Sequence, residues 1–291
     1  MSNYPFKLGV ITDEVSQDIF EAAEFAKKHK LDSLEIRSVN NHSPYELTDE
    51  DVAEIKKAAN ENGLEIAAIS SPLFKCDFYD DSARAEHIKG FKRCVEIAKE
   101  LGASMIRGFD FWANGVSLKE RVSAYKPIIE ICEKENITCV IEFDPSIHSS
   151  TAKLTAELVN KINHPNIKAL FDPGNLPFAD TNTPPFPDAY NQLMPNIKHI
   201  HIKDPALIDG KIDCVKVGEG KIVDFSSLFT QLAKDGYNGH VMLETHYRKN
   251  VDLTEEQLKR PGGSSFSLGA RPASEESITS LINIIKNSLE G

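Results

Sequence analysis

Four short apolar segments from residue 138 onward each deliver a side chain that can bind a metal ion. Three of these side chains are carboxylates and the fourth is an imidazole, from one of two histidines in a His-Ile-His run. Such a set suits Mn²⁺, Co²⁺, Mg²⁺ or Zn²⁺. Three carboxylates would repel one another in a partly buried site, and a divalent cation removes that cost. The residues are Glu142, Asp172, Glu244 and either His199 or His201.

These side chains can meet only if the segments that carry them are neighbouring strands. Eight apolar runs of strand length occur along the chain, and stretches with a 3.6-residue apolar period separate them. The helix after the sixth run is the least clear, because three prolines lie between residues 184 and 187. The runs are 8–12, 33–37, 64–70, 104–108, 138–143, 167–171, 197–202 and 240–243.

Eight strand-helix units predict an α/β protein, a (β/α)8 TIM barrel formed by a single domain over residues 1–291. An open doubly wound sheet is the alternative, but no glycine-rich phosphate motif follows the first run. In such barrels the active site lies at the C-terminal ends of the strands. The four candidate ligands end four consecutive runs, so we expect them at that face.

Each of these residues also has a simpler explanation. A carboxylate at a strand end can cap the next helix, and Asp172 stands in an ordinary Asp-Pro-Gly-Asn turn sequence. The two histidines alternate with isoleucines and therefore share one face of their strand, so one of them can be a core residue. The succession of four such strand ends is what favours a site.

Composition narrows the class of protein. The hydrophobic share is 41% and the formal net charge is −11. An acidic surface repels phosphate backbones, which argues against a nucleic-acid partner. The sequence has no apolar run long enough to predict a membrane span, and residues 1–7 lack the apolar segment of a secretory signal. Five cysteines without a Cys-x-x-Cys pair suit reduced, buried thiols, so we expect a cytoplasmic protein.

The sequence resembles the xylose isomerase-like TIM barrel superfamily, in particular its sugar phosphate isomerase/epimerase branch. The resemblance covers most of the chain and begins with Leu8-Gly9-Val10-Ile11-Thr12-Asp13-Glu14 and Leu34-Glu35-Ile36-Arg37. It is most specific in Ile141-Glu142, Phe171-Asp172-Pro173-Gly174-Asn175, His199-Ile200-His201-Ile202-Lys203-Asp204, Val217-Gly218-Glu219-Gly220 and Leu243-Glu244-Thr245-His246.

The resemblance implies one divalent metal, most often Mn²⁺, bound by Glu142, Asp172, His201 and Glu244. It also implies that the second histidine of the His-x-His run is the ligand, and that Glu142 and Glu244 act as an acid/base pair on opposite faces of a small carbohydrate. Abstraction of a proton next to a carbonyl would give an enediolate, which a metal stabilises. The implied reaction is isomerisation or epimerisation of a sugar or sugar phosphate.

Several other residues are candidates from their position. His148 and Asn175 follow the fifth and sixth runs, where relatives place groups that contact substrate; Lys203 and Arg107 end the seventh and fourth runs and could bind hydroxyls or a phosphate. Surface or ion-pair roles are the alternative for these four. We further expect a structural ion pair between Glu35 and Arg37, a pocket wall or ordinary packing for Trp112, and an anion site or a solvated loop at Arg271.

Two matters stay open from the sequence. Segment 254–272 is too long for an ordinary connection, so it is either an active-site loop or a mobile excursion. The main alternative reaction is that of an inosose dehydratase-like lyase on the same metal site. An endonuclease-type hydrolase, which needs three metals and more histidines, and a noncatalytic sugar-binding barrel fit less well. A homo-oligomer is an open alternative to a monomer.

Overall fold

A computed structural model describes residues 4–180, 182–249 and 251–290, and shows a closed barrel of eight parallel strands. The strand order around the barrel is β1-β10-β7-β6-β5-β4-β3-β2, so the barrel strands follow one another in chain order. The hairpin of β8 and β9, inserted after β7, is not part of the barrel. This confirms the predicted (β/α)8 architecture. The barrel strands are β1 (Lys7–Ile11), β2 (Ser33–Ile36), β3 (Glu65–Leu73), β4 (Met105–Gly108), β5 (Thr138–Glu142), β6 (Ile167–Phe171), β7 (Ile197–Ile202) and β10 (His240–Leu243).

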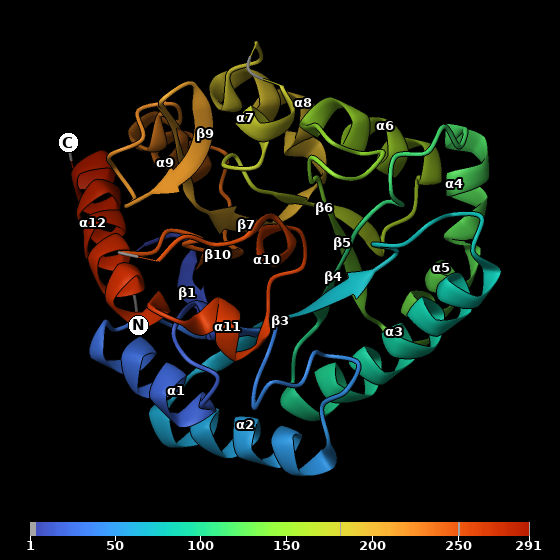
Figure 1. Ribbon diagram of the computed structural model, residues 1–291, viewed down its shortest axis with the longest axis horizontal. Coiled ribbons are helices and arrows are strands. Elements are labelled where there is room, and N and C mark those ends of the chain that lie inside the picture. The colour runs from blue at the N-terminus through green and yellow to red at the C-terminus, as the bar shows by residue number, and fades with distance from the viewer. Residues whose placement is uncertain (1–3, 181, 250, 291) are drawn as a thin grey trace.

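Helices surround the barrel and cover its outer surface (Figure 1). Local sequence explains several of their ends. Thr48 and Asp51 form the expected capping box before the second helix, and glycines at 63 and 102 adopt positive φ after the second and third. The main helices are α1 (Ile19–Lys28), α2 (Asp49–Asn62), α3 (Asp81–Leu101), α4 (Leu118–Ala124), α5 (Lys126–Glu135), α6 (Ala152–Ile162), α9 (Phe225–Lys234) and α12 (Ala270–Glu290).

The connection between β6 and β7 lacks one long helix. It holds the short α7 (Leu176–Ala179), a π-helical turn over Pro185–Ala189 and the short α8 (Tyr190–Leu193). Prolines at 184, 185 and 187 cannot donate backbone hydrogen bonds, which prevents a regular helix there. The helix that was least clear in the sequence, after the sixth run, is therefore broken into short turns in the structure.

A two-stranded antiparallel hairpin, which sequence reasoning did not anticipate, follows β7. It consists of β8 (Asp204–Ile208) and β9 (Lys211–Val215). The chain after it folds back so that Asp204 accepts hydrogen bonds from the backbone N–H groups of Gly218 and Gly220 at 2.7 and 2.9 Å. A Cβ atom at Gly220 would lie 2.2 Å from the Asp204 carboxylate. This close approach explains the glycine in the Val-Gly-Glu-Gly motif.

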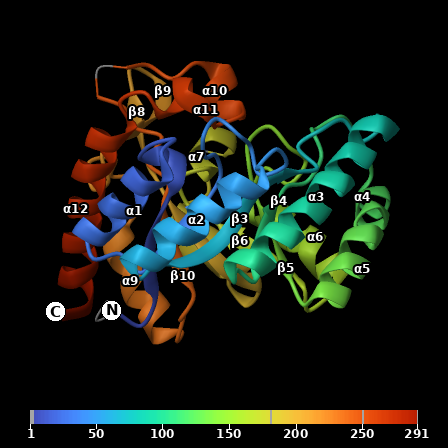
Figure 2. The same cartoon turned by 90° about the horizontal axis from the view of Figure 1, so that it is seen from below.

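Segment 254–272 lies at the C-terminal end of the barrel, on the same side as the β8–β9 hairpin (Figure 2). It contains α10 (Glu255–Lys259) and α11 (Gly263–Ser267). The backbone N–H of Gly263 donates to Ser38 Oγ at 3.2 Å, and that of Ser264 donates to Asn41 Oδ1 at 2.7 Å. Segment 254–272, which follows β10 in the chain, thus crosses the mouth of the barrel and contacts the loop after β2. None of the described helices has the length and apolar character of a membrane span.

Candidate metal centre

The barrel brings the four predicted ligands together at its C-terminal mouth. Glu142 is the last residue of β5, His201 lies near the end of β7, and Asp172 and Glu244 follow β6 and β10 directly. One ligand atom from each of the four lies within 4.8 Å of the others, and all four residues are buried. The carboxyl ends of parallel strands meet at one edge, which accounts for the convergence. The assignment of these residues as metal ligands remains a prediction.

The imidazole of His201 is oriented as a ligand would be. Its Nε2 lies 3.0 Å from Glu35 Oε2, which can accept the ring proton. Its Nδ1 is buried without a hydrogen-bond partner, 3.6 Å from Glu142 Oε1 and 3.5 Å from Glu244 Oε2. A carboxylate behind one ring nitrogen fixes the other nitrogen as the coordinating atom in many metal sites. The unpartnered nitrogen beside two carboxylates is the observation that fits a cation best.

His199 lies apart from the carboxylate cluster. Its Nε2 is 2.6 Å from Glu35 Oε2, and the only group in which the described residues place it as a ligand is with Glu35 and His201. The geometry therefore favours His201 within the His-Ile-His run. Ser70 Oγ also donates to the Glu35 carboxylate, so this buried acid accepts from three side chains.

The expected ion pair between Glu35 and Arg37 is wrong. The two residues share a face of β2, but Glu35 lies within the strand and contacts the histidines inside the barrel. Arg37 follows the strand, one layer nearer the mouth. There its guanidinium pairs with Asp13 at 2.9 Å, with Glu14 at 2.8 Å and with Glu244 at 2.5 Å. From the sequence both residues were expected at the end of the second strand, and the sequence did not show that Glu35 lies deeper in the barrel than Arg37.

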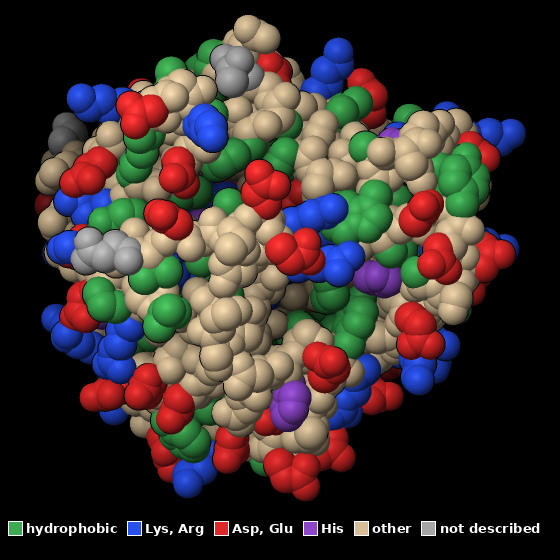
Figure 3. All heavy atoms as spheres, in the orientation of Figure 1, with side chains coloured by type: hydrophobic (Ala, Val, Ile, Leu, Met, Phe, Trp, Pro, Cys, Tyr) green, Lys and Arg blue, Asp and Glu red, His purple; other side chains and the backbone are tan. Residues whose placement is uncertain are grey.

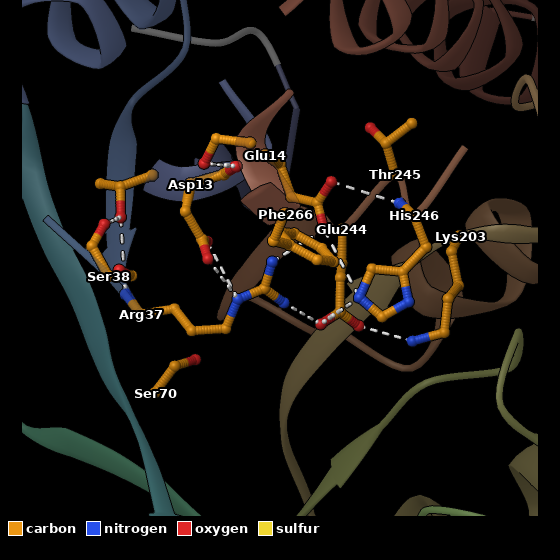
Figure 4. A network of polar contacts seen from close by, with 12 residues as sticks. Asp13, Glu14, Arg37, Ser38, Ser70, Lys203, Glu244, Thr245, His246 and Phe266 are labelled. Carbon is orange, nitrogen blue, oxygen red and sulfur yellow. Dashed lines mark hydrogen bonds and ion pairs between the residues drawn. The ribbon is translucent and has the colours of Figure 1, made fainter. Parts of the chain in front are cut away.

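The network around Arg37 holds Oε1 of the Glu244 carboxylate, whereas Lys203 contacts Oε2 (Figure 4). Arg248 pairs with Glu14 at 3.0 Å, and Phe266 from α11 stacks under the Arg37 guanidinium at 4.8 Å. A buried charge is stable when it is paired and hydrogen-bonded, as each of these is. Segment 254–272 thus contributes a ring that covers this network.

Electrostatics in the cluster favour a further positive charge. Burial raises the pKa of Asp172; Lys203 opposes that effect, and the carboxylates of Glu244 and Glu142 add to it, so that the pKa reaches about 7. Lys203 contacts Asp172 and lies 2.5 Å from Glu244 Oε2. Even with this ammonium present, one carboxyl of the cluster would retain its proton near neutral pH. A divalent cation would remove that penalty.

Three of the four candidate substrate contacts line a cavity of about 340 Å³ above the cluster: Arg107, Asn175 and Lys203. Asn175 Nδ2 donates to Glu142 Oε1 at 3.0 Å, and Arg107 Nη1 lies 3.2 Å from Glu142 Oε2. His148 does not line this cavity, because its imidazole faces Asn114, with Nε2 3.1 Å from Asn114 Oδ1. The structure therefore gives no contact that supports a substrate role for His148.

Sequence reasoning missed several residues that line the cavity. His246 follows Glu244 by two positions, and its Nε2 is buried, unpartnered and 3.4 Å from Glu244 Oε1. Burial lowers the pKa of His246, which favours the neutral ring. Lys75, Phe109 and Lys259 are among the other lining residues. The period-2 spacing of Glu244 and His246 was the one signal that could have indicated a shared face.

Comparison with known proteins identifies the family. A model described as xylose isomerase-like TIM barrel matches residues 23–263. The chain belongs to this family. Among curated proteins, the 3-dehydroshikimate dehydratase of Bacillus anthracis is 24% identical over 197 residues, which cover 65% of this chain and 67% of that protein.

Solved structures with the same fold include a zinc-bound protein, an epimerase-like protein and a probable dehydratase. An IolI protein with a bound zinc atom superposes with a TM-score of 0.73 at 19% identity, covering 98% of this chain and 100% of that one. A D-tagatose 3-epimerase-like protein gives 0.72 at 18% identity, with 98% and 100% covered. The probable 3-dehydroshikimate dehydratase AsbF of Bacillus anthracis gives 0.69 at 19% identity, with 93% and 98% covered. At these identities the similarity shows the fold.

Proposed function

We propose that this protein is an enzyme, a divalent-metal-dependent isomerase or epimerase of a small carbohydrate, with Glu142 and Glu244 as its acid/base pair. The observation that carries the proposal is the buried, unpartnered Nδ1 of His201 beside the carboxylates of Glu142 and Glu244. Relatives that act on sugars by their printed names, the D-tagatose 3-epimerase-like protein and a 3-keto-D-glucoside 4-epimerase from E. coli, share the fold and support this choice.

Glu142, Asp172, His201 and Glu244 would hold the metal. A bound divalent cation supplies Lewis acidity, which polarises a carbonyl and stabilises the negative charge that develops when the neighbouring C–H loses its proton. We favour Mn²⁺, as the resemblance implied, with Co²⁺, Mg²⁺ and Zn²⁺ as alternatives. The IolI structure holds zinc, so zinc must be among the ions tested when the protein is loaded with metal.

Glu142 and Glu244 are suited to exchange protons with a substrate between them. They come from β5 and β10, which lie three strand steps apart around the barrel, so they approach a ligand in the mouth from different sides. For both carboxyls burial favours the protonated form, but nearby cations outweigh burial and lower the pKa, Arg107 at Glu142 and Lys203 at Glu244. Both are therefore carboxylates at neutral pH, and either can accept the first proton.

Other residues of the cavity would orient the substrate. Asn175 holds Glu142 through its amide, and the neutral ring of His246 offers a nitrogen beside Glu244 that can bind a hydroxyl. Lys203 lies between Asp172 and Glu244, where its ammonium can hold an oxygen of the substrate. These groups fix which C–H faces a carboxylate and which hydroxyl stays in place.

A dehydratase is the second candidate, because the curated relative from Bacillus anthracis is named as one. The first step would be the same proton abstraction next to a carbonyl. Loss of a hydroxide from the adjacent carbon, in place of return of the proton, would then give an unsaturated product. The same carboxylates would serve both reactions, so the products must decide.

One experiment separates these outcomes. The protein is loaded in turn with Mn²⁺, Co²⁺, Mg²⁺ and Zn²⁺ and incubated in D₂O with ketohexoses, inososes and 3-dehydroshikimate, and the products are followed by NMR. Deuterium incorporated next to a carbonyl together with a new stereoisomer supports the epimerase. An unsaturated product supports the dehydratase. A metal-loaded protein that causes neither exchange nor turnover of any of these compounds contradicts the proposal.

A further inference from the structure

A second, wider cavity opens beside the one above the ligand cluster. Its volume is about 1160 Å³, against about 340 Å³ for the first. Ligand pockets of about 300–1,000 Å³ hold drug-sized molecules, so the two together exceed what one monosaccharide fills. The same five residues line both cavities, which places the boundary between them: Lys75, Arg107, Phe109, Lys259 and Pro261.

Three of these five boundary residues are basic, although the chain as a whole carries a net charge of −11. Aromatic rings support all three cations. Lys75 Nζ and the Arg107 guanidinium lie 4.5 and 4.7 Å from the centre of the Phe109 ring, and Lys259 Nζ lies 4.5 Å from that of Trp112. Basic side chains also lie next to the hollow near the middle of the mouth in Figure 3. Three cations therefore gather at this boundary, and two of them are ion-paired, Lys75 with Asp144 and Arg107 with Glu142.

Two of these cations keep unused binding capacity. Arg107 is 4% exposed, and its Nε is buried without a hydrogen-bond partner. Its Nη1 pairs with Glu142 Oε2 at 3.2 Å and its Nη2 donates to the Ser70 carbonyl at 3.3 Å, so Nε is the donor that stays without an acceptor. Lys259 Nζ lies over the Trp112 ring, and within the described ranges no ion pair joins it to an acidic side chain. Lys75 is paired with Asp144 at 2.7 Å.

Acidic residues also line the wide cavity, but most are engaged elsewhere. Glu46 accepts a hydrogen bond from Ser43, and Asp77 accepts one from the amide of Asn114. Asp80 caps the start of α3. These hydrogen bonds hold three of the carboxylates in place without removing their charge, whereas Lys259 has no ion pair among the described residues and the Nε of Arg107 has no acceptor. The acidic residues are Glu46, Asp77, Asp80 and Glu86.

We propose that the substrate carries an anionic group, a carboxylate or a phosphoryl group, which binds Arg107 and Lys259 at the boundary of the two cavities. The unpartnered Nε–H of Arg107 can donate to a carboxylate or phosphate oxygen, and the Lys259 ammonium adds a second charge. The preferred substrate is then an acidic sugar or cyclic polyol acid rather than a neutral ketose. This inference rests on the proposed function and assigns the substrate class of the same site.

The chain carries its own reporter for this test. Trp112 is the single tryptophan of the sequence, and it lines the wide cavity with Lys259 over its ring. A ligand that recruits Lys259 must change the surroundings of that indole. Fluorescence of the metal-loaded protein is therefore titrated with D-glucuronate, D-glucose 6-phosphate and D-glucose at constant ionic strength, with calorimetry as a second readout. The two anionic sugars separate a carboxylate site from a phosphoryl site.

Matched variants complete the design. Lys259→Met and Arg107→Met remove the proposed contacts, and Lys211→Met changes an exposed lysine of β9 that lines neither cavity. We expect saturable binding of at least one anionic sugar, at least tenfold tighter than that of D-glucose. Each of the two contact variants should weaken it at least tenfold, and Lys211→Met should leave it unchanged.

The inference is overturned if neither anion binds better than D-glucose, or if either contact variant binds the anions as tightly as the wild type. Metal uptake is measured on the same samples. A protein that takes up metal but shows no anion preference contradicts only this inference, whereas a protein that takes up no metal contradicts the proposed function.

Discussion

Glu35 offers a direct test of how the barrel interior positions the metal centre. Its carboxylate lies 2.6 Å from His199 Nε2 and 3.0 Å from His201 Nε2. Burial alone raises the pKa of Glu35, but His201 and His199 outweigh it and lower the pKa well below the usual range. Glu35 is therefore a carboxylate at any pH near neutral, and it directs the Nδ1 of His201 toward Glu142 and Glu244.

The substitution Glu35→Gln keeps the shape of the side chain and removes its charge. Both imidazoles contact Glu35 Oε2, so an amide oxygen in that place can still accept from them, but it lacks the negative charge that strengthens both hydrogen bonds. Mutation of such a partner behind a ligating histidine costs about 10- to 100-fold in metal affinity. That range corresponds to about 1.4–2.7 kcal/mol of binding free energy. We expect Glu35→Gln to bind Zn²⁺ or Mn²⁺ weaker by this factor.

The assay is competition for the metal against a chelating dye, with circular dichroism to verify the fold. Glu65→Gln is the matched control, because Glu65 is an exposed carboxylate at the start of β3 that pairs with Lys7. It should bind metal as the wild type does. A folded Glu35→Gln protein with wild-type affinity would refute the argument that Glu35 orients His201.

Three further predictions concern the acid/base pair, the fold and the cysteines. Glu244→Gln should keep the fold and lower kcat by about 10²- to 10⁴-fold as expected for a lost general base, whereas Asp172→Ala should also lose the metal; full activity of Glu244→Gln would rule out its role. Burial raises the pKa of Asp51, but hydrogen bonds from Asn40 and Thr48 lower it to about 2, below the ordinary value of 3.8. The stabilisation of the folded state by the Asp51 carboxylate is then complete well above pH 3.8 and is lost as the pH falls toward 2. Asp51→Asn should lower the free energy of unfolding by about 2 kcal/mol at pH 7 and about half of that at pH 3, measured by urea denaturation. An equal loss at both pH values would contradict this assignment. All five cysteines are free and buried, and burial raises the pKa of each thiol, so a thiol reagent should label them only after unfolding; rapid labelling of the folded protein would contradict the buried placement.

The strands could be predicted because buried parallel strands are apolar on both faces. All eight apolar runs correspond to barrel strands, with ends that differ by at most three residues, as at β3. The convergence of Glu142, Asp172, His201 and Glu244 followed from the rule that active sites lie at the carboxyl ends of barrel strands. That rule needs only the order of elements along the chain.

What could not be predicted depends on contacts between distant segments. The two histidine partners of Glu35 are 164 and 166 residues away, so its neighbours in sequence gave no indication of them. The β8–β9 hairpin is different, because its Asp209-Gly210 turn and the alternation of polar and apolar residues in Lys211–Val215 are hairpin signals that sequence reasoning overlooked. Segment 254–272 had two interpretations, an active-site loop or a mobile excursion, and its residues Lys259 and Pro261 line the cavity, as those of an active-site loop would.

Arg271 and Trp112 each had two interpretations, and the structure separates them. Arg271 lies near the start of α12, 3.8 Å from Glu21 and 3.9 Å from Glu24 on α1, so it belongs to a partly exposed ion pair. Trp112 lines the wide cavity, as a pocket wall would. Whether a side chain faces solvent or a cavity depends on how neighbouring strand-helix units pack. The sequence of one unit does not contain that information.

The central claim is that this barrel holds one divalent metal through His201 and three carboxylates. Metal content by mass spectrometry, on gently purified wild-type protein beside His201→Ala, tests it most directly. The account predicts about one metal ion per chain in the wild type, bound at purification or taken up from Mn²⁺, Co²⁺ or Zn²⁺, and its loss in His201→Ala. A folded wild-type protein that takes up none of these ions would contradict the account.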